Sequence, residues 1–355
     1  MMDDETPRAT SATALAVRFE KQADVSRVIA DVATLAAAPR GRHHPREMVR
    51  AQEYVTARLI EAGWQVRHVP FERRWVIGVT DAGGRTMKLR RWRLFPRLVG
   101  VNLLADLPNA APGRWILLVA HLDSVACSPG ADDNASGVAA LLESARLLAS
   151  LPDPPAVRLA LVDLEELGRV GSRALAAAPG FLRDLQAVLC LESVGTFTSQ
   201  PQTQELGGLG LLFRGLARQV EANQNRGDFV LAVCRRSSSG IARALTAAGA
   251  ALATPLTVLT ARDPRADGLR GRLVTRLLPP LANLDRSDHA SFWNRGVPSL
   301  MLTTTAPFRN QHYHLPGDRP ENLDYPRLTA LAAVVAATAA GWPSSPQTSP
   351  PAERR

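Results

Sequence analysis

The stretch "HLDSVACSPGADDNASGVA", residues 121–139, carries most of the information about this chain. A histidine, an aspartate two residues later and two adjacent aspartates precede a run of small residues that is typical of a helix start. Acidic side chains this close together repel one another and are costly to bury. Because a bound metal ion would compensate them, we expect further metal ligands elsewhere in the chain.

The segments around this stretch predict an α/β fold. "RWILLVA" (residues 114–120) is a short apolar run, typical of a strand buried on both faces, and "SGVAALLESARLLASL" (136–151) has the pattern of a helix. Strands that alternate with helices imply a largely parallel sheet covered on both faces. Further strands are expected at residues 64–72, 156–164, 186–194, 229–234 and 297–305, and helices at 44–63, 171–178, 208–223 and from Tyr325.

Potential ligands follow three successive buried strands. His121 and Asp123 come directly after the first strand, Glu165 and Glu166 after the second, and Glu192 closes the third. In such sheets the ligand site lies beyond the carboxyl ends of the strands. Carboxylate and imidazole donors without a thiolate suit zinc in an open, catalytic site, with manganese or cobalt as substitutes.

A second histidine is expected to complete the site. His43, His44 and His68 lie where a structural or exposed role is expected. His289, His312 and His314 remain, in "SDHASFWNRGVPSL" and "NQHYHLPGDRPENLDY".

Charge and composition narrow the partners. The chain has 355 residues and a formal net charge of +9, and nearly all of its basic residues are arginines. The densest basic run is "KLRRWRLFPR" (residues 88–97), which follows Gly83 and Gly84 in a stretch with the pattern of a hairpin. No nucleic-acid recognition motif accompanies it, so we interpret it as a solvated hairpin face and predict no nucleic-acid partner.

The two ends of the chain differ from its middle. Residues 1–20 and 343–355 are polar or proline-rich and are expected to be disordered, with one folded domain over 21–342. The start of the chain lacks a continuous apolar region, and the longest apolar stretch, residues 328–342, is too short and alanine-rich for a membrane span. Three cysteines without C-x-x-C spacing imply no disulfide framework. These features predict a cytoplasmic protein without a membrane partner.

Five motifs in order resemble the zinc aminopeptidase family M28, whose superfamily includes the glutaminyl cyclases. They are "HLD", "GADDNASG", "EELGRVGS", "SDHASF" and "YHLPGDRPENLDY", and the resemblance covers roughly residues 40–342. It implies a single three-layer α/β domain of the zinc-exopeptidase type, with a mixed, mostly parallel sheet covered by helices on both faces.

The resemblance also implies roles for individual residues. His121 is similar to the histidine on the first zinc, and Asp132 to the carboxylate that bridges two Zn²⁺ ions, with a cis peptide bond between Asp132 and Asp133. Glu166 is similar to a ligand of the second zinc, and Glu192 falls where many members have aspartate. His314 is similar to the last ligand, since an aspartate four residues on and "ENLDY" follow it; His312 is the alternative.

Three groups near these ligands have other expected roles. Glu165 is similar to the general base, a free carboxylate that passes a proton to a leaving amine. Asp123 is expected to orient His121, as carboxylates commonly do for metal-binding histidines. Asp288 either polarises a bound group or caps the helix at "SDHASF". His289 on that helix is expected to be a packed or rim residue and not a ligand, and Cys127 to be a small apolar filler.

These features favour a dinuclear zinc hydrolase that removes N-terminal residues from a peptide or small amide substrate. A glutaminyl-cyclase-like acyltransferase with one zinc is the first alternative, although Tyr313 stands where cyclases tend to place a tryptophan. An inactive binding homologue is the second. The substrate pocket is expected to involve residues 196–206 and 261–285.

Overall fold

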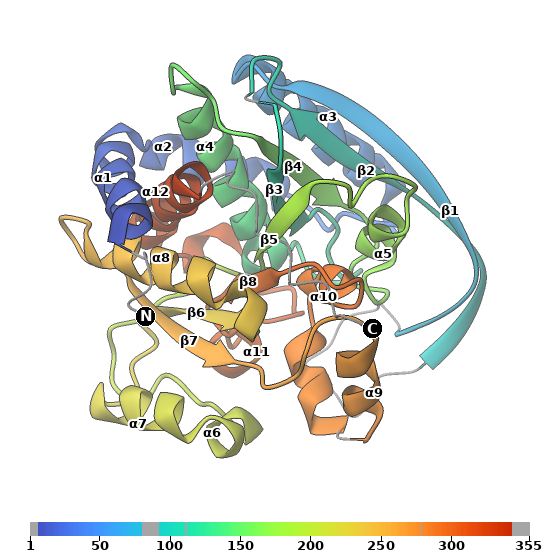
Figure 1. Cartoon of the computed structure of the whole chain (residues 1–355). Helices are drawn as coiled ribbons and strands as arrows, with labels where there is room; N and C mark the ends of the chain where they lie inside the picture. The colour runs from blue at the N-terminus through green and yellow to red at the C-terminus, as the bar shows by residue number, and fades with distance from the viewer. Residues whose placement is uncertain (1–5, 80–91, 111, 278, 343–355) are drawn as a thin grey trace, which may run out of the picture.

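The computed structural model describes residues 6–79, 92–110, 112–277 and 279–342, and its described part is built on one eight-stranded sheet (Figure 1). The order across the sheet is β1-β2-β4-β3-β5-β8-β6-β7. The strands are β1 (Gln65–Val79), β2 (Trp92–Asp106), β3 (Trp115–His121), β4 (Val157–Val162), β5 (Leu185–Leu191), β6 (Phe229–Cys234), β7 (Thr257–Arg262) and β8 (Ser299–Thr303).

The sheet is mixed and mostly parallel, as predicted. β3 is parallel to β4 and β5, β5 is parallel to β8, and β6 is parallel to β7. The pairs β1–β2, β2–β4 and β6–β8 are antiparallel. The hairpin expected around β1 and β2 is confirmed, whereas its Gly83-Gly84 turn and the first part of the basic run lie outside the described residues.

Helices cover both faces of the sheet, which confirms the three-layer prediction. Along β3, Leu118 and Ala120 point into one apolar core, and Leu117 and Val119 into another. The first core is covered by α1 (Thr6–Gln22), α2 (Val25–Leu35), α3 (Pro45–Glu61), α4 (Gly137–Ala149), α8 (Ser239–Ala250) and α12 (Tyr325–Gly341). The opposite face is covered by α5 (Val170–Ala176), α7 (Arg214–Ala222) and α10 (His289–Trp293).

The remaining elements are short. They are the kinked turn η2 (Ala131–Ser136), the helices α6 (Gly208–Leu212), α9 (Leu269–Leu277) and α11 (Ala306–Arg309), and the 3₁₀ turns η3 (Arg236–Ser238), η4 (Pro279–Asp285) and η5 (Pro320–Asn322). The helix expected over residues 208–223 is therefore divided into α6 and α7 at Phe213. No helix in the described ranges has the length and apolar character needed to cross a bilayer.

The N-terminal segment corrects one expectation. Residues 1–20 were expected to be disordered, but α1 begins at Thr6. Ala12, Ala16 and Phe19 are buried, and α1 contacts α12 and α8. These three residues recur at helical spacing and form a narrow apolar stripe, which packs closely because α12 is rich in small residues. The tail expected to be disordered, residues 343–355, lies outside the described residues.

The strand directions bring the expected ligands together. Because β3, β4 and β5 are parallel neighbours, their carboxyl ends meet at one edge of the sheet. His121 is the last residue of β3, Glu165 and Glu166 follow β4, and Glu192 comes directly after β5.

Candidate metal centre

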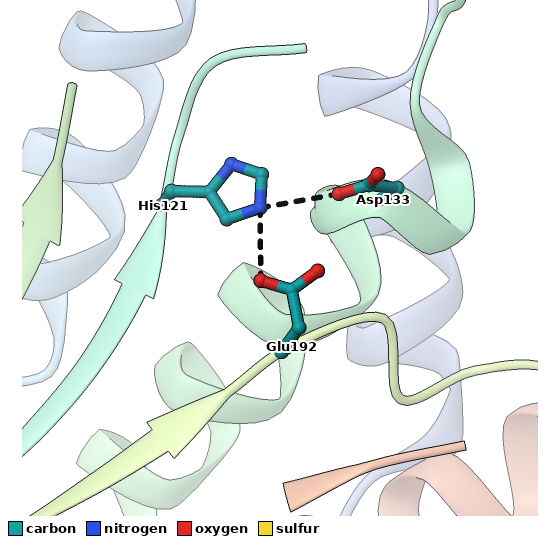
Figure 2. Close-up of side chains that lie close together, drawn as sticks. All are labelled: His121, Asp133 and Glu192. Carbon is teal, nitrogen blue, oxygen red and sulfur yellow. Dashed lines mark ion pairs between the residues drawn. The ribbon is translucent and has the colours of Figure 1, made fainter. Parts of the chain in front are cut away.

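One group of possible ligands forms around His121. Its Nε2 atom lies 3.1 Å from Asp133 Oδ1 and 3.3 Å from Glu192 Oε2. Figure 2 shows the imidazole at the end of its strand with both carboxylates turned toward the same nitrogen. The three side chains are therefore gathered from the ends of β3 and β5 and from the turn that leads into α4.

A second group forms around His314 and shares one member with the first. His314 Nε2 lies 3.0 Å from Asp133 Oδ2 and 3.3 Å from Glu166 Oε2. Each oxygen of the Asp133 carboxylate thus faces a different histidine. In each group the possible ligand atoms lie within 4.8 Å of one another. His312, the alternative to His314, is exposed and belongs to neither group.

The buried atoms without hydrogen-bond partners in these groups fit a metal ion. His121 Nε2, Asp133 Oδ1, Glu166 Oε1 and His314 Nε2 are buried and have no hydrogen-bond partner among the described residues. Their contacts are short but poorly directed for hydrogen bonds. Buried polar atoms are nearly always paired, so these exceptions need an explanation. Imidazole nitrogens and carboxylate oxygens converging on a common space are the donors that zinc takes.

Asp123 holds two parts of the centre in place. Its backbone carbonyl accepts a hydrogen bond from His121 Nδ1 at 3.0 Å, which leaves Nε2 facing the centre. Its carboxylate accepts the backbone N–H groups of Glu165 at 3.0 Å and Glu166 at 3.2 Å. The carboxylate also lies 3.6 Å from His121 Nδ1. The predicted positioning of His121 is thus made mainly by the carbonyl, while the carboxylate positions the two glutamates.

Asp132 does not take the position predicted for it. Its carboxylate accepts hydrogen bonds from Gly195 N, Thr196 Oγ1 and Asn310 Nδ2 at 2.8, 2.7 and 3.0 Å. It is paired away from both histidines, and Asp133 stands between them instead. The cis peptide bond is also displaced by one residue, to Asp133–Asn134. Adjacent side chains point in different directions, so a shift of one residue exchanges the two roles.

The turn that carries Asp133 is built by specific neighbours. Gly130 has a φ of 62°, and a Cβ atom there would lie 2.3 Å from the carbonyl oxygen of Asp133, so the turn requires glycine. Asp318 accepts the backbone N–H groups of Asp132 and Asp133 at 3.0 and 3.1 Å. From the sequence, Asp318 served only to mark His314; its position four residues after that histidine was the available signal.

Glu165 lies beside the two groups without belonging to either. It is 9 % exposed. Burial raises the pKa of its carboxyl well above the ordinary value, His121 opposes that rise, and Asp288 and Glu192 add to it. Burial likewise raises the pKa of Glu166 to about 7, opposed by His314. Burial lowers the pKa of His121, but the charge of Glu192 and contacts with Asp123 and Asp133 outweigh it and raise that pKa.

Glu192 and Asp288 complete this part of the site. Ser193 Oγ and Ser287 Oγ donate to the Glu192 carboxylate at 2.9 and 2.6 Å. Ser287 was not identified from the sequence, where nothing distinguishes it from other serines. Asp288 makes no side-chain cap on α10, so its predicted capping role is wrong. It is fully buried, and burial raises its pKa to about 7.

The two other expectations for nearby residues have different outcomes. His289 is buried, with Nε2 2.9 Å from the carbonyl oxygen of Leu284 and its ring edge-on to Trp293, which confirms the expected packing role. Cys127 is exposed, and its thiol donates to the backbone oxygen of His314 at 3.5 Å, so it is not a buried filler.

An apolar cavity of about 70 Å³ adjoins Glu192. Its apolar lining comes from α6, β6, η4, β8 and α11, and from Tyr313 after α11. The predicted 261–285 segment contributes Leu284, and Leu209 lies just past the predicted 196–206 segment. The apolar side chains are Leu209, Leu231, Val233, Leu284, Met301, Ala306, Pro307, Phe308 and Tyr313.

Comparison with known proteins agrees with this architecture. The model of peptidase family M28 matches residues 102–339, and the chain belongs to that family. A relative from Escherichia coli K12, named "Uncharacterized protein YfbL", is 31 % identical over 245 residues, which cover 65 % of this chain and 67 % of that protein. The family predicted from the motifs is therefore confirmed.

Two solved structures illustrate the shared fold. A zinc aminopeptidase from Bacillus subtilis superposes with a TM-score of 0.60 at 15 % identity, covering 89 % of this chain and 94 % of that one. A glutaminyl cyclase from Macrostomum lignano superposes with a TM-score of 0.58 at 16 % identity, covering 96 % of this chain and 93 % of that one. At these identities the similarity shows the fold alone.

Proposed function

We propose that this chain is a dinuclear zinc aminopeptidase that removes N-terminal residues from peptides. The observation that carries the proposal is the position of Asp133, whose two carboxylate oxygens face His121 and His314 separately. A carboxylate shared in this way suits two adjacent metal ions. His121 and Glu192 would hold one ion, Glu166 and His314 the other, and Asp133 both.

The metals would supply Lewis acidity for the scissile carbonyl and an activated water. The chain's own side chains carry out the proton transfer and hold the reacting groups in position. Glu165, free of both ligand groups and with a raised pKa, receives a proton at its carboxylate and delivers it to the leaving amine nitrogen. Asp123 keeps Glu165 in position through the hydrogen bond to its backbone N–H.

The apolar cavity beside Glu192 supports a preference for peptides whose first residue is apolar. Its walls are leucine, valine, methionine and phenylalanine side chains next to one end of the ligand cluster. An apolar side chain of a peptide's first residue would bury its surface there while its carbonyl lies at the metals. We therefore expect peptides that begin with a medium-sized apolar residue to be the better substrates.

The first test is the zinc content of the desalted protein, by elemental mass spectrometry. We expect about two zinc ions per chain, because two ligand groups share Asp133. His314→Ala should lose one of them, and His312→Ala, which removes an exposed histidine two residues away, should lose none. About one zinc in the unaltered chain, with cyclisation of N-terminal glutamine peptides, would favour the cyclase alternative instead.

The second test separates catalysis from metal binding. Glu165→Gln should keep both metals and lose roughly 10²- to 10⁴-fold in turnover of aminoacyl anilides, since the amide cannot accept the proton. Glu221→Gln makes the same chemical change at an exposed glutamate on α7 and should leave turnover unchanged. Normal turnover in Glu165→Gln would remove Glu165 as the base.

A further inference from the structure

A second cavity, of about 490 Å³, is lined mainly by arginines. It shares none of its lining residues with the two ligand groups of the metal centre. Its five basic residues are Arg73, Arg169, Arg173, Arg272 and Arg295, and no aspartate or glutamate lines it. We call it the arginine cavity.

The five arginines come from four separate segments. Arg73 lies in β1, Arg169 directly before α5, Arg173 within α5, Arg272 in α9 and Arg295 just after α10. Figure 1 shows α5, α9 and α10 on the same side of the molecule, where the long strand β1 curves past them. The fold therefore brings together charges that lie up to 222 positions apart, from 73 to 295. A locally basic stretch of sequence does not account for the cavity.

These charges are not neutralised by the described part of the protein. None of the five guanidinium groups forms a salt bridge with an acid in the described ranges. Arg73 and Arg169 instead donate to the backbone oxygens of Ala174, at 3.4 Å, and Asp285, at 2.5 Å. The carboxylate of Asp285 is already held by both terminal nitrogens of Arg265 at 2.8 Å.

Arg173 shows the electrostatic consequence. Burial lowers the pKa of its guanidinium, and the positive charges of Arg169, Arg73 and Arg272 lower it further. Like charges that converge around a hollow repel one another, so an anion in the cavity would relieve an unfavourable arrangement.

We propose that the arginine cavity binds a small organic anion that carries linked phosphate groups. A guanidinium group matches phosphate geometry with two parallel hydrogen bonds, and five such groups exceed what one carboxylate or one phosphate needs. The volume falls in the range of small-molecule sites and is large for a single inorganic phosphate. Val76, Val170, Ala176 and Ala177 form an apolar wall for the organic part, and Ser291 and Asn294 add polar groups.

Calorimetric titration of the zinc-loaded full chain tests the proposal, with adenosine triphosphate and inorganic tripolyphosphate as separate probes in dilute salt. We expect binding that weakens as salt rises, because the contact is ionic. Tighter binding of the nucleotide would assign the apolar wall to an organic group, and tighter binding of tripolyphosphate would assign the cavity to inorganic phosphate chains. Tighter binding of tripolyphosphate would therefore keep the site for linked phosphates but overturn its organic part. If neither probe binds, the whole proposal is overturned.

Variants distinguish the cavity from metal chelation by the probes. Arg173→Ala combined with Arg272→Ala removes two guanidinium groups that line the cavity and should weaken binding at least about tenfold. Arg218→Ala removes an exposed arginine on α7 and should leave affinity unchanged. Arg173→Lys combined with Arg272→Lys keeps the charges and should recover part of the affinity. That recovery would show that the double alanine variant loses affinity through the lost charges and not through misfolding. Equal affinity in the double alanine variant and the unaltered chain would overturn the proposal.

Discussion

Two clusters of buried charge in this molecule differ in how completely their polar atoms are paired. The first is the candidate metal centre. The second, which we call the arginine network, consists of Arg235, Asp263, Arg265 and Asp285 and follows the ends of β6 and β7. Arg265 Nε lies 3.0 Å from Asp263 Oδ1, and its terminal nitrogens contact Asp285. Arg235 Nε donates to Asp263 Oδ2 at 3.1 Å, and its guanidinium lies 4.0 Å from the Trp293 ring centre.

The difference teaches how to separate structural charge from functional charge. In the arginine network, opposite charges meet in well-directed hydrogen bonds and need no further partner. In the metal centre, buried atoms of His121, Asp133, Glu166 and His314 approach one another without such bonds. The same contrast holds between neighbouring residues. The Asp132 carboxylate accepts four hydrogen bonds, whereas Asp133 Oδ1 accepts none from the described residues. Both clusters are buried, so burial does not distinguish them. Polar atoms without a hydrogen-bond partner distinguish the cluster that is suited to a ligand.

The largest effect is expected from substituting Asp133, whose Oδ1 atom has no hydrogen-bond partner among the described residues. Asp133→Asn should lower zinc affinity at least about 100-fold and turnover with it, because a shared ligand loses its charge. Asp132→Asn is the matched control. It should keep zinc and lower the free energy of unfolding by about 1–3 kcal/mol, since an amide group would face hydrogen-bond donors. Chelator competition and urea unfolding measure the two quantities; zinc loss in Asp132→Asn alone would restore the bridging role to Asp132.

The next largest effect is expected in the arginine network. Asp263→Asn should lower the free energy of unfolding by about 3–5 kcal/mol, because Arg235 and Arg265 would keep buried charges with one partner removed. Turnover per folded molecule and zinc content should stay unchanged. Asp267→Asn removes a more exposed carboxylate on the same Arg235 and should cost about 1 kcal/mol or less. Zinc loss in Asp263→Asn would show that the two clusters are not independent.

The smallest effect concerns protonation of a packed histidine. The pKa of His289 is lowered to about 3, mainly by burial; the hydrogen bond to the Leu284 carbonyl opposes this shift, and the charges of Arg169 and Arg235 add to it. The unfolded chain therefore binds more protons between about pH 6.5 and 3, so stability falls as pH falls through that window. From pH 6.5 to 5 the unaltered chain should lose up to about 2 kcal/mol relative to His289→Gln, measured by urea unfolding. A difference that stays constant with pH would contradict this assignment.

Most of the fold could be predicted because its strands are short, continuous apolar runs. The run at residues 229–234 coincides with β6, and residues 114–120 differ from β3 by one position at each end. β7 was not identified, since exposed residues alternate with buried ones along it and it lacks a continuous apolar run. α1 was misjudged because its buried residues Ala12, Ala16 and Phe19 recur only at helical spacing, among small and polar residues.

The candidate site was predicted to within one residue for a related reason. The strand ends gave the positions of His121, Glu165, Glu166 and Glu192, because parallel strands deliver their ends to one edge. The choice between Asp132 and Asp133 depends on the direction of two adjacent side chains in a non-helical turn. That direction is set by Asp318 and by Gly195, Thr196 and Asn310, which lie far away in sequence. The arginine cavity was not predicted for the same reason, since its five members share no local pattern.

The two contacts of Asp123 have a consequence for genetic experiments. The carbonyl that holds His121 belongs to the main chain and is present whatever residue stands at position 123, whereas the carboxylate that holds Glu165 and Glu166 is lost on substitution. A mutational scan would therefore report only the second contribution. The tolerance measured at this position would underestimate how much of the centre depends on the segment that passes through it.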